Sequence, residues 1–188
     1  MALLLEKTQS SYFPAFKELF RETYEALEEA ADINAHLKPM TSHLELLENG
    51  DFAVIAKSFE IVFHCICLVW AHSKYYCRPP RLIVLLQELN NLIMKRTNLY
   101  LKPIELFKME PEEAMEKIRK TFSTLETYLN SYEDHKKKIL TYFKNGIPPK
   151  EWEFSRNLVF ALWDKFMERM NMINVKVLNF NKLKYQHV

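Results

Sequence analysis

A long apolar stretch between Phe52 and Trp70 dominates the hydrophobic pattern of the chain. Its apolar residues recur every three or four positions, which is the period of an α-helix. They occupy several sides of that helix, and Lys57, Glu60 and His64 keep only a narrow polar edge. A helix that is apolar on nearly all sides has to be surrounded by other elements. The pattern therefore predicts a central helix wrapped by the rest of the chain.

A membrane span is the alternative interpretation of this stretch. The uncharged run from Ile61 to Ala71 is far shorter than the roughly 20 residues that cross a bilayer. We therefore expect a buried helix and no membrane contact.

Two helical patterns precede the central helix. From Ser10 or Ser11 to about Lys38, apolar residues mark one face, and Pro39 is expected to kink or end this helix. A short helix should follow over 41–48. The sequence 49–51, Asn-Gly-Asp, predicts a left-handed glycine and an aspartate that caps the central helix. The apolar face of the first helix is formed by Phe13, Phe16, Phe20, Leu27 and Ala31.

Three further helices are predicted after the central one. Paired prolines open a helix that ends near Lys102, and the last helix starts near Ser155. The longest runs from Glu112 to Lys144 and would measure roughly 50 Å at about 1.5 Å per residue. A compact globule of this chain length has a diameter near 40 Å. We therefore expect an all-α fold, an elongated bundle of about five to six long helices without a sheet. The apolar seam of the longest helix contains Met115, Ile118, Phe122, Leu125, Leu129, Tyr132, Ile139 and Phe143.

The helical patterns predict one domain with two loose ends. Residues 11–175 should form a single helical domain, preceded by a flexible start at 1–10. The segment 176–188 mixes polar and isolated apolar residues without a sustained period, so we expect a frayed end.

Composition excludes several classes of function. A formal net charge of +2 argues against a dedicated nucleic-acid binder, which usually has a concentrated basic face. The chain has two glycines, Gly50 and Gly146, whereas phosphate-binding and dinucleotide-binding loops need several at fixed spacing. We therefore expect no nucleotide cofactor and no enzymatic activity.

Cysteine usage and the N-terminus bear on the compartment. Three cysteines without an Asn-x-Ser/Thr acceptor site favour a reducing compartment. The apolar run at residues 2–5 is too short for a signal peptide and lacks a basic lead-in. The expected protein is intracellular and soluble.

Side-chain geometry argues against the two candidate metal sites. His64, Cys65 and Cys67 are close in sequence, but on a helix the two cysteines point about 200° apart. His36 and His43 are separated by a proline, and no carboxylate completes a site. No catalytic, cofactor-binding or metal-binding residue is therefore predicted.

Four segments carry a resemblance to a known family. Trp70, Ser73, Tyr75 and Tyr76 form the pattern W-x-x-S-x-Y-Y. A helix over 31–44 precedes this pattern, and a connector over 100–107 follows it. The fourth segment starts at a tryptophan and ends in F-x-x-R; its residues are Trp152, Phe160, Asp164, Phe166 and Arg169. In this order and spacing the segments resemble the N-terminal tail region of dynein heavy chains, with an axonemal character, over roughly 13–173.

The resemblance implies a protein-interaction segment. Such a tail joins heavy chains to one another and to intermediate and light chains, and it anchors a microtubule motor in the axoneme of a cilium, within the cytoskeleton. It implies no motor activity of this chain, because 188 residues with two glycines cannot contain the ATPase ring. We expect a fragment, a truncated product or a tail-only relative.

The resemblance also suggests structural roles. Trp70 and Tyr76 are expected to lock the end of the central helix to its loop. Trp152 should cover an end of the bundle, and Arg169 should reach a helix-terminal carbonyl or an acid.

Two alternatives stay open at this point. Ile139 and Phe143, beyond a run of lysines, are candidates for an open partner surface, unless the segment around Trp152 folds back over them. The alternative function is a helical bundle that binds a small apolar ligand in its core.

Overall fold

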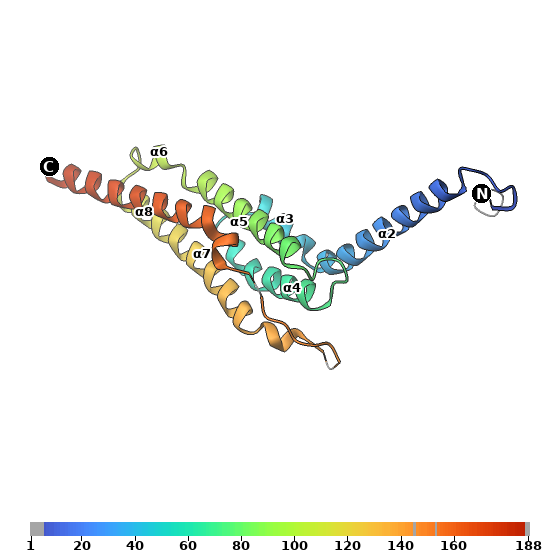
Figure 1. The fold of residues 1–188 in the computed structure, drawn as a ribbon. Helices are drawn as coiled ribbons and strands as arrows, with labels where there is room; N and C mark the ends of the chain where they lie inside the picture. Colours follow the sequence, from blue (N-terminus) through green and yellow to red (C-terminus); the bar gives the residue numbers. More distant parts are fainter. Residues whose placement is uncertain (1–5, 145, 153, 187–188) are drawn as a thin grey trace.

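A computed structural model of the chain describes residues 6–144, 146–152 and 154–186, and over these residues it contains helices and no strand. Its shape is elongated (Figure 1), as the helix lengths predicted. The five long helices are α2 (Phe13–Leu37), α4 (Phe59–His72), α5 (Pro79–Leu101), α7 (Pro111–Lys137) and α8 (Arg156–Gln186). Shorter elements are α3 (Thr41–Asn49), α6 (Pro103–Leu106) and the 3-10 turns η1 (Lys38–Met40), η2 (Ile55–Ser58) and η3 (Ile139–Tyr142).

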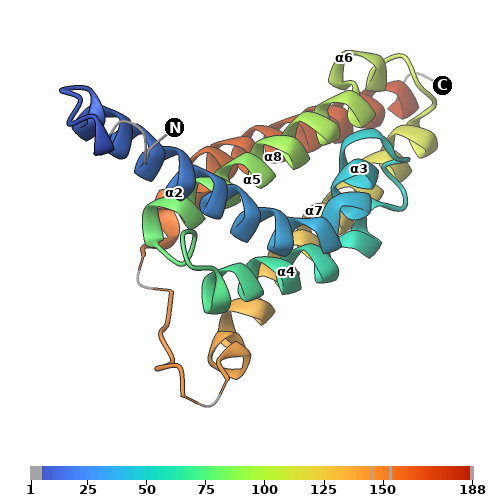
Figure 2. The ribbon, with the colours of Figure 1, turned by 90° about the vertical axis from the view of Figure 1, so that its right-hand side faces the viewer.

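The helices pack in pairs. α4 packs along α7, and α5 packs along α8. In Figure 2, α5 and α8 lie side by side, and α4 lies on the other side of the molecule. α2 contacts α4 through its C-terminal part, while its N-terminal part projects away from the bundle (Figure 1).

The central apolar stretch is the core helix α4, as predicted, but it begins later than expected. A turn and η2 precede it, so that regular α-helix starts at Phe59. Gly50 is extended, with φ −72° and ψ 172°, and not left-handed. A Cβ atom there would lie 2.4 Å from Leu46 Cδ1, so close approach explains the glycine. The Asp51 carboxylate accepts from the backbone N–H of Ala53 at 3.0 Å, and therefore caps the preceding turn and not α4.

The stretch Ile55–His72 passes a length and hydropathy test for a membrane span, with a mean hydropathy of 1.4. However, 61% of this window is buried inside the protein. Phe59, Phe63 and Ile66 are at most 1% exposed. Burial by other helices accounts for the apolar character, as a core helix requires.

The longest predicted helix is shorter in the structure and turned about its axis. α7 ends at Lys137 and does not continue to Lys144, because the chain tightens into η3. Its 27 residues span roughly 40 Å at about 1.5 Å per residue. The buried face includes Thr121, Tyr128 and His135, whereas Leu129 is half-buried.

Aromatic rings fill the centre where α4, α5, α7 and α8 meet. Tyr128 is fully buried, stacks on Trp163 with ring centroids 4.9 Å apart, and contacts Phe59 and Phe63 at 5.2 Å. Its hydroxyl donates a hydrogen bond of 2.6 Å to Asn90 Oδ1. Such packing leaves this centre occupied by protein side chains.

The expected loose ends are only partly within the described residues. Residues 1–5 and 187–188 lie outside them. α8 continues to Gln186, through most of the segment for which we expected a frayed end. Val177 is fully buried and Asn181 is 8% exposed, so the buried stripe of α8 extends beyond residue 176.

Candidate protein-interaction surface

The N-terminal part of α2 presents an apolar stripe that no described part of the chain covers. Phe20 is 64% exposed, Tyr24 54% and Leu27 66%. They follow at spacings of four and three and therefore share one face of the helix. α2 has no buried residue over its 25 positions. We call Phe20, Tyr24 and Leu27 the α2 stripe.

The opposite side of α2 is charged. Arg21 forms ion pairs with Glu18 and, at 2.6 Å, with Glu25, at the i,i+3 and i,i+4 spacings that support a helix. The hydrogen bonds that the Arg21 guanidinium donates to both glutamates raise its pKa. Over its whole length α2 carries six acidic side chains against one lysine and one arginine. An apolar stripe with acidic flanks results.

Asp32 attaches α2 to the loop between α4 and α5. Its carboxylate accepts a hydrogen bond of 2.5 Å from the Ser73 hydroxyl and bonds of 3.2 and 3.3 Å from the backbone N–H groups of Lys74 and Tyr75. Burial raises the pKa of Asp32, but these hydrogen bonds outweigh it and the net pKa lies below its ordinary value. The ionised carboxylate is thus the form that the junction stabilises.

Glutamates one turn earlier extend this junction. Glu28 accepts from Lys74 Nζ at 2.8 Å and from the Tyr75 hydroxyl at 3.0 Å. Glu29 pairs with Arg81 at 2.7 Å. The family-like residues Ser73 and Tyr75 therefore hold α2 against the bundle.

Trp70 and Tyr76 lie near this junction with different partners. Trp70 is 1% exposed, and its indole N–H donates to the Lys150 carbonyl at 3.4 Å. Lys150 Nζ lies 4.1 Å from the centroid of the Trp70 ring and donates to the Cys77 carbonyl at 2.6 Å. Tyr76 accepts at its hydroxyl from Arg81. Trp70 is thus tied to the α4–α5 loop through Lys150, whereas Tyr76 contacts Arg81 in the first turn of α5.

Trp152 and Phe160 pack against the C-terminal part of α7. Trp152 is 6% exposed and lies 5.4 Å from the ring of Tyr132. Phe160 is 1% exposed and contacts the same ring at 4.7 Å. Both rings therefore cover Tyr132.

The polar members of the fourth segment bind side chains. Asp164 forms two hydrogen bonds with Arg156, at 2.6 and 2.9 Å. Arg169 was expected at a helix-terminal carbonyl or an acid, but its guanidinium donates to the Asn98 side-chain oxygen at 3.3 Å. It also lies over the ring of Phe166, which is 5% exposed. Arg169 thus links α8 to α5.

The prediction that Ile139 belongs to an open partner surface is wrong. Ile139 is 3% exposed and belongs to the core, and Phe143 is half-buried against it. The 3-10 turn after Lys137 directs Leu140, 47% exposed, to the outside instead. Ile139 and Trp152 line one cavity of about 250 Å³, so the segment around Trp152 does fold back towards Ile139.

The α2 stripe was visible in the sequence as an apolar face, but its exposure was not. Its periodicity is the same as that of a buried stripe. The only local signal is the acidic excess around it. Asp32 lies in one of the four segments that carry the family resemblance. Its hydrogen-bond partners, Ser73 and Lys74, are more than 40 residues away in the sequence.

The structure offers little for metal or thiol chemistry. Among the described residues no group of three His, Cys, Asp or Glu side chains could hold a metal ion. Cys65 and Cys67 are buried and free. Burial raises the pKa of the Cys67 thiol to about 12, so at neutral pH the thiol stays protonated.

Comparison with known proteins points to one family. The family model described as "Dynein heavy chain, N-terminal region 1" matches residues 1–187. The ciliary dynein beta chain of Heliocidaris crassispina is 43% identical over 92% of the chain. Dynein axonemal heavy chain 9 of Homo sapiens is 41% identical over 97%, and the flagellar outer arm dynein beta chain of Chlamydomonas reinhardtii is 34% identical over 96%. The chain spans about 4% of the length of these relatives.

Proposed function

Because this chain belongs to the dynein heavy chains, where it matches their N-terminal region, we propose that it is a non-catalytic assembly segment of an axonemal dynein tail. In this role it associates with other heavy chains and docks intermediate or light chains. The relatives are named ciliary, axonemal or flagellar, which supports a place in the axoneme.

The α2 stripe is the observation that carries this proposal. Phe20, Tyr24 and Leu27 are each more than half exposed on a helix that projects from the bundle. An amphipathic helix of this kind docks by laying its apolar face into a groove of a partner. Contiguous apolar side chains left in water are typical of protein interfaces.

The junction at Asp32 supports the same role. It fixes the C-terminal part of α2 by hydrogen bonds to Ser73 and to two backbone N–H groups. A helix held in one orientation loses less conformational entropy on binding than a free helix.

The alternative function, a small apolar ligand in the core, gains no support from the packing. The rings that would line such a site stack on one another around Tyr128 and Trp163. We therefore favour the assembly role.

The test replaces Phe20 and Leu27 by glutamine. The double variant should lose binding of a purified intermediate chain or heavy-chain tail by at least about tenfold, because two apolar anchors are removed from the interface. It should keep its helix content and unfolding midpoint, since neither residue is buried. Light scattering after size exclusion reports self-association, and titration calorimetry reports partner binding.

A matched control replaces Lys17 and Glu22 by glutamine. Both residues are exposed on the same helix, and the pair of changes leaves the net charge unaltered. Binding by this control should be within about twofold of wild type. Equal binding by the Phe20–Leu27 variant and the wild type would remove the α2 stripe as the docking surface.

A further inference from the structure

The outer side of α8 carries a regular row of exposed positions that no described part of the chain covers. Their spacing alternates between four and three residues, which is the seam pattern of a coiled coil. We call this row the α8 seam. Its members, each of them exposed, are Leu158, Leu162, Lys165, Arg169, Met172, Lys176, Asn179 and Leu183.

The α8 seam is distinct from the face by which α8 joins the bundle. α8 packs against α5 and α7. Trp163, Met170 and Val177 recur every seven residues on the buried face, and each is at most 1% exposed. From Leu158 to Leu183 the seam is about 38 Å long at about 1.5 Å per residue. A partner helix therefore has room to lie along α8.

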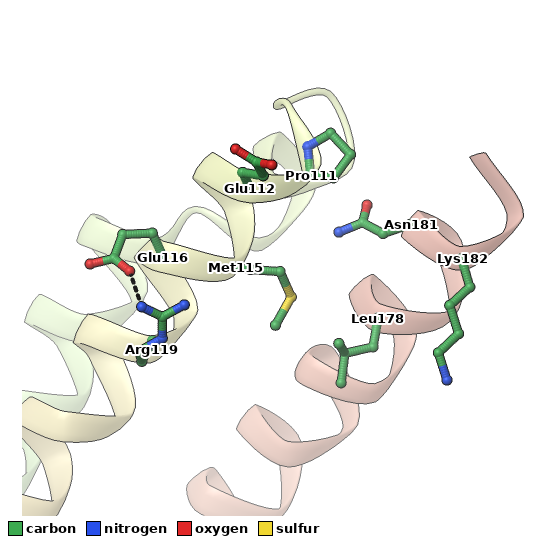
Figure 3. A pocket seen from close by; sticks show the side chains of 8 residues that line it. All are labelled: Pro111, Glu112, Met115, Glu116, Arg119, Leu178, Asn181 and Lys182. Carbon is green, nitrogen blue, oxygen red and sulfur yellow. Dashed lines mark hydrogen bonds and ion pairs between the residues drawn. The ribbon is translucent and has the colours of Figure 1, made fainter. Parts of the chain in front are cut away.

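The last described turns of α8 also border a cavity, on a different side from the seam. This cavity of about 580 Å³ opens between α7 and α8 (Figure 3). Leu178 and Asn181 extend from α8 on the side of α7. Leu183 follows Leu178 by five residues and therefore lies about 140° around the helix from it. The α8 seam thus faces solvent and not the cavity.

The charged members of the α8 seam are all cationic. Lys165 and Lys176 are exposed and form no ion pair among the described residues. Arg169 donates to the neutral side chain of Asn98 and pairs with no acid in the described part of the chain. Beyond Glu168, α8 contains no acidic residue. The seam therefore combines leucines at both ends with unpaired positive charge at its centre.

This arrangement disfavours a second copy of the chain and a membrane as occupants. Two α8 seams aligned end to end, parallel or antiparallel, would place Lys165 and Lys176 against lysines, and facing like charges repel. An amphipathic helix on a membrane carries its cations on the polar face, whereas here they interrupt the apolar row. A protein helix of opposite charge fits the seam better than either.

We propose that the α8 seam binds a helix of a partner protein that is apolar at both ends and carries Asp or Glu at its centre. The apolar side chains of this helix pack against Leu158, Leu162 and Leu183. Its carboxylates pair with Lys165 and Lys176, which makes the seam selective for an acidic partner. The proposal rests on the assembly role, but it concerns a surface separate from the α2 stripe.

The test uses a synthetic helical peptide with the length and the heptad spacing of the α8 seam. The glutamate peptide has leucine at both ends of its own seam and glutamate opposite Lys165, Arg169 and Lys176; it is made in parallel and antiparallel order. We expect saturable binding of one peptide per chain for one of the two orders, measured by fluorescence anisotropy. A lysine peptide, with lysine in place of these glutamates, should bind at least about tenfold more weakly because like charges meet.

The Lys165→Glu, Lys176→Glu variant should reverse this preference. It should bind the lysine peptide and lose affinity for the glutamate peptide by at least about tenfold. Its unfolding midpoint should be unchanged, because both lysines are exposed. The Lys17→Glu, Lys38→Glu variant makes the same change of charge at two other exposed positions and should keep the preference for the glutamate peptide.

The Phe20→Gln, Leu27→Gln variant separates this contact from docking at the α2 stripe. It should bind the glutamate peptide with wild-type affinity, and loss of binding would place the peptide on α2. The proposal is also overturned if neither order binds saturably, if the two peptides bind equally, or if Lys165→Glu, Lys176→Glu keeps the wild-type preference. Sedimentation with phosphatidylserine vesicles that this variant abolishes would identify a membrane as the occupant instead.

Discussion

At the scale of residues, buried polar side chains connect helices that are distant in sequence. The Tyr128 hydroxyl of α7 donates to Asn90 Oδ1 of α5 at 2.6 Å, and Asn90 Nδ2 donates to the Val159 carbonyl of α8 at 2.9 Å. Burial raises the pKa of the Tyr128 hydroxyl well above its ordinary value, so it remains a proton donor at neutral pH. Three helices are thereby joined by one amide.

Asn90→Leu tests this network. The variant should lower the free energy of unfolding by about 1–3 kcal/mol, because it leaves the Tyr128 hydroxyl buried without an acceptor. In a Tyr128→Phe background the same change should cost clearly less. Urea unfolding of the four proteins of this double-mutant cycle measures the coupling. Additive effects of the two changes would mean that the hydrogen bond contributes nothing.

Ile139 and Leu140, which follow the lysine run, test which side chain is buried there and which is exposed. Ile139→Asp should unfold the domain or lower its stability by several kcal/mol, because it puts a charge in the core. Leu140→Asp, at a neighbouring position that is 47% exposed, should change the stability by about 0.5 kcal/mol or less. Thermal unfolding followed by circular dichroism distinguishes them, and equal midpoints would contradict the burial of Ile139.

At the scale of elements, α2 has two parts with different roles. Its C-terminal part is bound to the α4–α5 loop through Asp32 and Glu28, and to the start of α5 through Glu29. Its N-terminal part contacts little else and exposes the α2 stripe. A helix with one exposed apolar face is the result, and its orientation depends on a few polar contacts.

Asp32→Asn should weaken this junction in a pH-dependent way. The pKa of Asp32 is lowered in the folded chain from an ordinary value of 3.8, so its contribution to stability is complete above that value. The contribution is lost as the pH falls through the folded pKa. The stability difference between wild type and variant, about 1–3 kcal/mol near pH 7, should therefore shrink once the pH falls below the ordinary value and through the lower folded pKa.

Urea unfolding at several pH values measures this difference. Glu22→Gln, at an exposed position of α2, serves as the control and should differ little from wild type at any pH. His36 Nδ1 lies 3.8 Å from the Asp32 carboxylate, so the series should be repeated with His36→Gln. A difference that stays constant from pH 7 to pH 3 would contradict the role of the ionised carboxylate.

At the scale of the whole molecule, the bundle is elongated and its two ends differ. α2 projects at one end, and the cavity between α7 and α8 opens at the other (Figures 1 and 3). The shape therefore suits a segment that has several contacts within a large assembly.

The radius of gyration tests this shape. A compact globule of 188 residues has a radius of gyration of about 16 Å. Small-angle X-ray scattering of the monomer should give a clearly larger value, because α2 extends beyond the bundle. The Phe20→Gln, Leu27→Gln variant provides the monomer if the wild type associates. A value near 16 Å would show that α2 folds back in solution.

Local signals in the sequence determined the helices, several of their ends and the central position of α4. Pro39, Pro79 and Pro111 lie at helix boundaries, where their missing N–H and fixed φ have direct local effects. The apolar run in α4 required burial whatever surrounded it. The resemblance to dynein tails also rested on residues readable in order along the chain, and the family match confirmed it.

Only the tertiary structure decided which apolar faces are covered. The apolar stripes of α2 and α7 have the same period. The stripe of α2 is exposed, whereas α7 buries a face that includes Tyr128. Periodicity records that a helix has an apolar face, whereas coverage depends on where distant helices lie. The partners of Asp32 and Asn90 lie roughly 40 to 70 residues away, so their roles had no local signal. For the same reason the partner surface was misplaced at Ile139, which the 3-10 turn after α7 directs into the core.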